Sequence, residues 1–259
     1  MSDRVADPIR RAQRVTPPGG RRAPTSPIRA ASAAPIDPAT AVVTFVAAWL
    51  GGQVLSSIVI AVTGGDPIDK APIGVLAAAL IAAWTAQLAG MWVASNRAGT
   101  GDLRIDYGIE AVPADAIGLG IGVLSQLVVI PVVYLPLRAV WSDTFTDERL
   151  EENARSLVDR ADGVALVVLF LLVVVGAPLV EELFYRGLLQ GPLAARFNGV
   201  VVVVGVAAVF ALVHVRPVEF PGLFVFGLIL GVCALYTGRL GLAITAHVGF
   251  NATGLLMVL

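Results

Sequence analysis

Long apolar runs separated by short polar connectors dominate the chain from about residue 41 onward. Most of these runs approach or exceed the roughly 20 apolar residues that an α-helix needs to cross a bilayer. The pattern predicts membrane-spanning helices at about residues 41–63, 72–95, 113–137, 163–196, 200–215, 222–236 and 242–259. We therefore expect an all-α fold, a polytopic membrane bundle of about seven transmembrane helices (seven to eight).

Composition agrees with this pattern. Hydrophobic residues make up 57% of the chain, charged residues 14%, and the mean hydropathy is +0.83. These values exclude a soluble domain of this length. The single cysteine, Cys233, lies in an apolar run, which excludes an intramolecular disulfide and a cysteine metal cluster.

Residues 1–39 differ from the rest of the chain, with seven arginines among Pro, Gly, Ala and Ser. Low hydropathy and many prolines predict a disordered basic tail. By the positive-inside rule the tail places the N-terminus in the cytoplasm of a multi-pass protein of the cell (plasma) membrane. A basic arm can also bind nucleic acid, but attraction to anionic membrane lipid requires no further specificity. We therefore expect lipid, and no nucleic acid, as its partner.

A second polar segment, residues 138–162, holds four arginines and seven acidic residues. Thr146 is a suitable N-cap for a helix over Asp147–Asp159. We expect an amphipathic helix on the outer surface, with a solvated charged face. No histidine lies nearby, so its acidic residues do not indicate a metal site.

The fourth run contains charges where lipid is expected, in Pro178-Leu-Val-Glu-Glu-Leu-Phe-Tyr-Arg-Gly187. Ionisable residues at membrane depth mark a functional site by default. Glu182 and Arg186 are four residues apart, so they share a helix face and can pair. Glu181 is rotated by about 100° from Glu182 and points elsewhere. One carboxylate is thus neutralised and the other is available.

The two histidines of the chain, His214 and His247, also lie in apolar runs. Glu181 lies 16 residues before Phe197 and His214 lies 17 after it, so an antiparallel hairpin brings them to one level. His247 is only about eight residues past the turn at Gly238–Arg239. Simple counting places it shallower than His214, by roughly 12 Å at 1.5 Å per residue, a difference that helix tilt or a protruding hairpin of the fourth and fifth spans would absorb.

Two chemistries suit this set of residues. A desolvated glutamate can act as general base for water, while histidines and an asparagine stabilise an oxyanion. Alternatively, two histidines and a glutamate can hold zinc with an open position for water. Both hydrolyse peptide bonds. No Gly-x-Ser-x-Gly or His-Glu-x-x-His is present, so serine hydrolase and zincin sites lack support.

Three motifs resemble those of one family, the CAAX proteases and bacteriocin-processing enzymes (the Abi or CPBP family of intramembrane glutamic endopeptidases, which includes the type II CaaX prenyl proteases). They are Glu181-Glu182-Leu-Phe-Tyr-Arg186, Phe210-Ala-Leu-Val-His214 and His247-Val-Gly-Phe-Asn251. The resemblance covers about residues 163–259. It implies that residues 40–259 form a membrane-embedded protease domain with its site inside the bilayer.

The resemblance also implies a role for each motif residue. Glu181 activates water with the help of His214, whereas His247 and Asn251 stabilise the oxyanion. Glu182, Arg186 and Phe210 are structural support. We expect no cofactor, with zinc held by Glu181, His214 and His247 as the alternative.

The implied function is an intramembrane endopeptidase that hydrolyses a peptide bond of a membrane-associated protein or peptide. Two other functions use the same features. A non-catalytic scaffold or bacteriocin-immunity protein could share the fold, and a transporter could use the buried charges for ion coupling.

Overall fold

The structure is a computed structural model that describes residues 36–65, 67 and 70–259. Most of the basic tail predicted at residues 1–39 therefore lies outside the described residues. Within the described ranges all regular elements are helices, which confirms the predicted all-α fold. Six helices there are long and apolar enough to cross a membrane, and a further apolar helix is shorter, so the chain is a multi-pass membrane protein.

The bundle begins with two long helices, α1 (Pro38–Val62) and α2 (Ile73–Ala98). The third and fourth spans are composite, because π-helical stretches interrupt them. Their segments are η2 (Pro113–Ala116), α4 (Ile117–Leu124), η3 (Ser125–Val129) and α5 (Ile130–Val140), then α7 (Gly163–Phe170), η4 (Leu171–Gly176), α8 (Ala177–Glu181), η5 (Glu182–Gln190) and α9 (Gly191–Ala194). The other helices are α3 (Leu103–Tyr107), α6 (Asp147–Asp159), α10 (Gly199–Leu212), α11 (Phe220–Thr237) and α12 (Gly241–Val258).

Side-chain caps fix where several helices begin. The Asp37 carboxylate accepts hydrogen bonds from the backbone N–H groups of the first turn of α1, at 3.0 Å. The Asn198 side chain caps α10 in the same way, and Thr146 caps α6 as predicted. These side chains satisfy donors that have no partner within the helix. The helix predicted over Asp147–Asp159 is confirmed.

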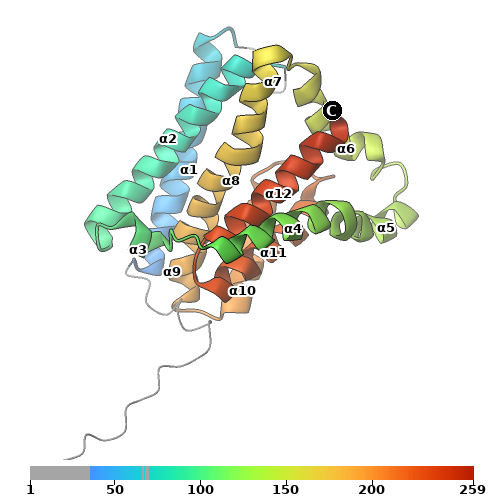
Figure 1. Ribbon diagram of the computed structural model, residues 1–259. Helices are drawn as coiled ribbons and strands as arrows, with labels where there is room; N and C mark the ends of the chain where they lie inside the picture. Colours follow the sequence, from blue (N-terminus) through green and yellow to red (C-terminus); the bar gives the residue numbers. More distant parts are fainter. Residues whose placement is uncertain (1–35, 66, 68–69) are drawn as a thin grey trace, which may run out of the picture.

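The seven predicted apolar helices all exist, but α10 is short. Its 14 residues extend over about 21 Å, less than the roughly 30 Å of a hydrocarbon core. In Figure 1, α10 and α11 occupy only one end of the bundle. The connector between them contains His214, which is partly buried, and Val215, which is 81% exposed.

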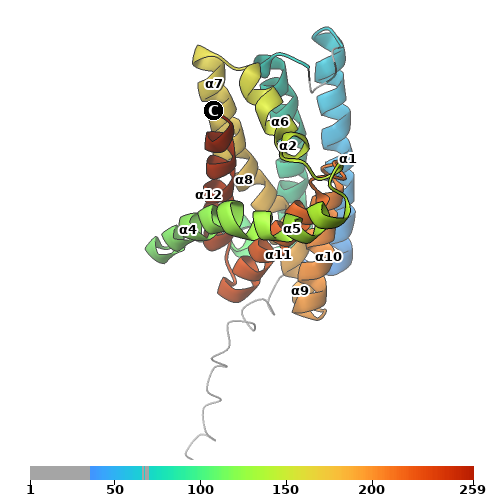
Figure 2. The ribbon, with the colours of Figure 1, turned by 90° about the vertical axis from the view of Figure 1, so that its right-hand side faces the viewer.

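The third span has an unexpected direction. Figures 1 and 2 show α4 and α5 running crosswise to α1, α2 and the α7–α9 span. Glycines let α4 approach α12 closely: a Cβ added at Gly122 would lie 2.1 Å from the Ala246 carbonyl oxygen, and one at Gly249 would lie 2.5 Å from that of Leu119. Small residues of this kind permit backbone contact between membrane helices. The contact fixes α12, the helix that carries His247 and Asn251.

Two polar contacts tie the crosswise span to other helices. The Tyr134 hydroxyl of α5 donates to the Val218 carbonyl (2.8 Å) and accepts from the Gly222 N–H (3.2 Å), so α5 holds the α10–α11 connector. Asp115 of η2 accepts two hydrogen bonds from Arg239, at 2.7 and 3.2 Å, in the turn before α12. Both ends of the crosswise span thus position elements that carry candidate site residues.

Candidate active site

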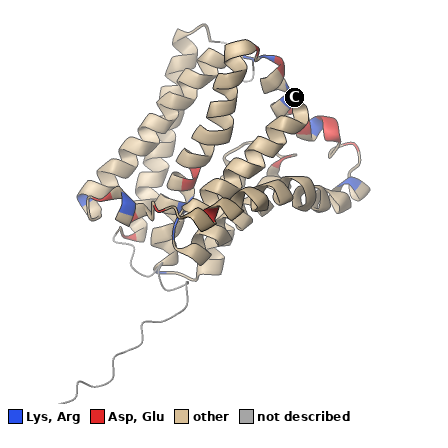
Figure 3. Ribbon diagram, viewed as in Figure 1, with Lys and Arg blue, Asp and Glu red and all other residues tan. Residues whose placement is uncertain are grey.

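The Glu-Glu-x-x-x-Arg motif lies where α8 passes into the π-helical η5, midway along the fourth span. Figure 3 shows acidic residues there, surrounded by uncharged helix, whereas most other charges lie toward the ends of the bundle. π-Helical stretches are rare and frequently occur at functional sites. The local backbone therefore adds a structural signal to the sequence motif.

The predicted pair of Glu182 and Arg186 is confirmed. An Arg186 terminal nitrogen lies 2.9 Å from Glu182 Oε1, and both side chains are completely buried. The guanidinium also donates to the Gly227 carbonyl (3.2 Å) and lies 4.7 Å from the centroid of the Phe210 ring. These extra contacts offset part of the high desolvation cost of a buried ion pair.

Glu182 has a second partner that the sequence did not predict. Its Oε1 also lies 2.8 Å from His247 Nδ1. Glu182 pairs with Arg186 and so accepts as a carboxylate, which assigns the hydrogen to Nδ1 of the imidazole. This contact orients the ring and directs Nε2 toward Glu181, as carboxylates often do for functional histidines.

Glu181 is the available carboxylate of the motif, as predicted. Its side chain is 25% exposed, and its Oε2 lies 3.8 Å from His247 Nε2. That separation exceeds a direct hydrogen bond and is long enough for a bridging water molecule. The two glutamates therefore face the two nitrogens of the His247 ring, Glu182 at Nδ1 and Glu181 at Nε2.

Both glutamates can face one ring because the helix is π-helical from Glu182 onward. A π-helix closes its hydrogen bonds over five residues, so consecutive side chains are rotated by less than the about 100° expected for an α-helix.

His214 contacts the Phe210 ring, which His247 also contacts. Its Nδ1 donates to the Phe210 carbonyl at 2.7 Å, so Nε2 remains as an acceptor. The Phe210 ring lies 4.9 Å from the His214 ring and 6.0 Å from the His247 ring, between centroids. The structure thus brings both histidine rings into contact with one ring, Phe210.

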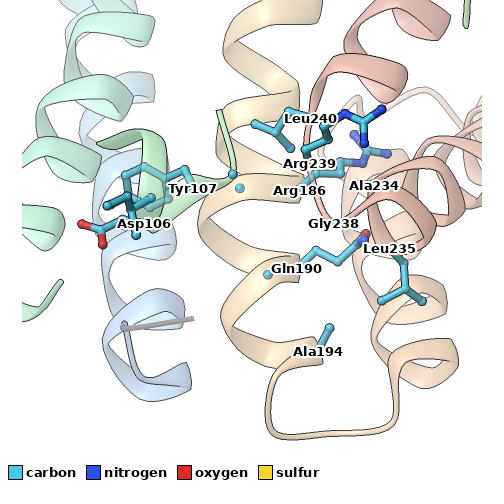
Figure 4. A pocket seen from close by; sticks show the side chains of 14 residues that line it. Asp106, Tyr107, Arg186, Gln190, Ala194, Ala234, Leu235, Gly238, Arg239 and Leu240 are labelled. Atoms are coloured by element: carbon cyan, nitrogen blue, oxygen red, sulfur yellow. The ribbon is translucent and has the colours of Figure 1, made fainter. Parts of the chain in front are cut away.

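The depth difference from simple counting, roughly 12 Å at 1.5 Å per residue, is therefore too large, because both rings contact Phe210. Arg186 and Arg239 line one cavity, so the turn before α12 lies beside the middle of the fourth span. Figure 4 shows Arg239 and Leu240 near Arg186, whereas Ala194 lies further along, next to the turn into α10. The α9–α10 hairpin projects beyond the α11–α12 turn, and this offset brings His247 nearer to the depth of His214 than counting predicts.

Asn251 lies one helical turn after His247, and its amide is held in place. Its Nδ2 donates to the Val173 carbonyl of the π-helical η4 at 2.8 Å. The second N–H and the Oδ1 have no hydrogen-bond partner among the described residues. On the flank of α12, Phe250 stacks on Phe226 at 3.7 Å, and Phe226 contacts the His247 ring at 5.4 Å.

The alternative zinc site was predicted from Glu181, His214 and His247. Across the part of the chain that the structure describes, no group of three His, Cys, Asp or Glu side chains is arranged to hold a metal ion. Both Nδ1 atoms donate hydrogen bonds, one to Glu182 and one to the Phe210 carbonyl, an arrangement that histidine ligands of zinc also show and that leaves each Nε2 open. The zinc alternative therefore stays a prediction.

Comparison with protein families matches residues 163–253 to the family described as Type II CAAX prenyl endopeptidase Rce1-like. The match confirms the predicted resemblance. All three motifs, from Glu181 to Asn251, lie within the matched residues. Comparisons with the curated proteins and with the solved structures gave no match. The roles of the individual motif residues stay predictions.

Proposed function

We propose that the protein is an intramembrane endopeptidase that uses Glu181 to activate water against a peptide bond of a membrane-associated substrate. The observation that carries this proposal is the position of His247 between two carboxylates, 2.8 Å from Glu182 and 3.8 Å from Glu181. The match of residues 163–253 to a protease family supports the same reaction class.

The reaction begins with a water molecule between Glu181 Oε2 and His247 Nε2. An O–H bond of the water breaks as its proton passes to the Glu181 carboxylate, and the oxygen bonds to the carbonyl carbon of the substrate. The oxyanion that forms is stabilised by the free N–H of the Asn251 amide. The C–N bond then breaks, and the proton returns to the leaving amine.

The two histidines complete this arrangement. With hydrogen on Nδ1, each presents an acceptor at Nε2, so His247 orients the attacking water and His214 accepts from substrate or water. The family resemblance assigned His247 to the oxyanion instead, which requires hydrogen on Nε2. The pH profile of cleavage distinguishes these roles, because an oxyanion donor loses activity as the ring deprotonates and a water acceptor gains it.

The test is cleavage of a membrane-tethered reporter peptide by purified protein in proteoliposomes. We expect Glu181→Gln to lower kcat by at least about 100-fold, the usual minimum contribution of a general base. Glu110→Gln is the matched control, because Glu110 is an acidic residue outside the site, in the loop after α3. Full activity of Glu181→Gln, at equal amounts of folded protein, contradicts the proposal and favours the scaffold or immunity function.

A further inference from the structure

A cavity of about 220 Å³ lies beside Arg186, between α3, the fourth span and the turn from α11 into α12. Figure 4 shows it from close by, with Arg186 and Gln190 extending from the fourth span toward α11. Glu181, Glu182 and His247 do not line it. The cavity is therefore separate from the proposed position of the attacking water, and Arg186 connects it to the motif.

Two polar atoms on the lining side chains have no hydrogen-bond partner among the described residues, namely Arg186 Nε, a donor, and Gln190 Oε1, an acceptor. Both residues are only 2% exposed. Their other groups are anchored. Arg186 donates to Glu182 and to the Gly227 carbonyl. Gln190 Nε2 donates to the Gly231 carbonyl at 2.8 Å. Buried polar groups are normally satisfied, so this pair requires a group that both accepts and donates a hydrogen bond.

The other charged side chains that line the cavity are Asp106 and Arg239. The Asp106 carboxylate accepts hydrogen bonds from Ser95 and Thr100, and Figure 4 shows it turned away from the two arginines. Arg239 donates to Asp115 through Nε and Nη2, and its side chain is 22% exposed. Its Nη1 has no hydrogen-bond partner within the described part of the chain, so the cavity offers a second donor beside Arg186.

The rim of the cavity is apolar and reaches the surface of the bundle. Ile105 and Leu235 line it from opposite sides, and Ile105 is 64% exposed. Arg97, Arg104 and Glu110, in and near α3, are also exposed. Exposed charges of both signs are costly within the hydrocarbon core, so this part of the surface lies at the level of the lipid headgroups. The cavity therefore opens where acyl chains and headgroups meet.

We propose that the cavity binds the headgroup of a membrane phospholipid that carries a hydrogen-bond donor. The donor binds Gln190 Oε1, the phosphodiester oxygens accept from Arg186 Nε and Arg239 Nη1, and the acyl chains lie against the apolar rim. A peptide chain fits less well, because it brings further backbone N–H and C=O groups that apolar walls leave unsatisfied. The inference goes beyond the proposed function: it assigns a lipid site whose headgroup holds the Arg186 guanidinium in place against Glu182.

The first experiment titrates four short-chain phospholipids into the wild type, in micelles of a detergent without N–H or O–H groups. Phosphatidylethanolamine and phosphatidylglycerol carry a donor. Phosphatidylcholine and phosphatidylmethanol are their respective controls, with the same net charge and no donor. Tm is measured throughout, because a ligand of the folded state raises Tm with its concentration. We expect Kd to be about fivefold lower for each donor lipid than for its control, the ratio for one hydrogen bond of ordinary strength. Equal Kd within either pair overturns the proposal.

The second experiment locates the bound lipid. Ala194 lines the cavity and Ala195 does not, so Ala194→Trp fills space inside it and Ala195→Trp adds the same side chain outside it. We expect the preference for donor lipids to disappear in Ala194→Trp and to persist in Ala195→Trp. Gln190→Met, which removes the acceptor at similar side-chain length, should also abolish the preference. Tm without lipid shows whether each variant is folded. A folded Ala194→Trp or Gln190→Met variant that keeps the preference overturns the site.

The same titration with N-acetylleucine methylamide tests a peptide group as the ligand. A rise in Tm with this compound and none with the donor lipids assigns the cavity to a peptide chain and overturns the lipid site. Every readout here is binding, whereas the test of the proposed function is cleavage. Lipid preference without cleavage supports the lipid site and contradicts the endopeptidase, and cleavage without lipid preference does the reverse.

Discussion

The buried contact between Glu182, Arg186 and His247 predicts that stability and activity can be separated. Glu182 serves two partners through one oxygen, at 2.9 Å from Arg186 and 2.8 Å from His247. The first contact compensates a buried charge, and the second orients a candidate catalytic ring. A pair of substitutions that removes both charges can restore stability without restoring the orientation of the His247 ring.

Single substitutions should destabilise strongly. Both charged side chains are completely buried, so Arg186→Met leaves Glu182 as an uncompensated charge and Glu182→Leu leaves Arg186. Breaking a buried pair in this way costs about 3–5 kcal/mol. For a chain of this size that corresponds to a fall of roughly 10 °C in Tm. Activity should fall with stability in both variants.

The double variant Glu182→Leu/Arg186→Met should recover most of the lost Tm, because replacing a buried ion pair with apolar residues is often neutral or stabilising. It should not recover cleavage, because the His247 ring has lost the acceptor for its Nδ1 hydrogen. The assay is thermal unfolding in detergent beside reporter cleavage in proteoliposomes. A wild-type Tm in either single variant refutes the structural role of the ion pair between Glu182 and Arg186. A double variant with wild-type cleavage refutes the positioning role of Glu182.

Two further predictions concern the backbone around the site. Gly122→Ala should lower Tm and cleavage, because the added Cβ would lie 2.1 Å from the Ala246 carbonyl oxygen and force α4 away from α12. The control is Gly120→Ala, whose Cβ would have no atom within 4 Å, and it should leave Tm and cleavage unchanged. Val215→Gly should raise Tm by about 2–4 °C, because Val215 has a φ of 52° that costs a β-branched residue about 1 kcal/mol. An unchanged Tm for Gly122→Ala, or a lower one for Val215→Gly, contradicts the reasoning.

Much of the fold could be predicted because lipid imposes a simple pattern. Runs of about 20 apolar residues can form little except helices at membrane depth, so the helix positions followed from hydropathy. The cap at Thr146 followed from equally local chemistry, and the structure confirms the helix that it begins. The crosswise direction of α4 and α5 depends instead on glycine contacts with α12, more than 100 residues away. The hydropathy pattern of a single helix does not show which distant helix it will contact.

The candidate site shows the same division. The pair of Glu182 and Arg186 is local, so its spacing predicted it, and the availability of Glu181 followed from the same spacing. The contact of Glu182 with His247 joins residues 65 positions apart, and no spacing rule applies to it. For His247, counting from the turns left helix tilt and a protruding hairpin open, because the relative depth of two turns depends on contacts between distant helices. The structure favours the protruding α9–α10 hairpin.

The contact that counting missed changes what the motif does. With Glu182 bound to both Arg186 and His247, its predicted structural role extends to the orientation of a candidate catalytic ring. Arg186 holds Glu182, Glu182 orients His247, and His247 presents Nε2 to the carboxylate of Glu181. The first two links are short contacts between buried groups, and the third is a 3.8 Å separation from the partly exposed Glu181, so we expect a change at Arg186 to reach the candidate catalytic glutamate through two intermediates. We therefore expect substitution of the motif arginine to affect cleavage as well as stability.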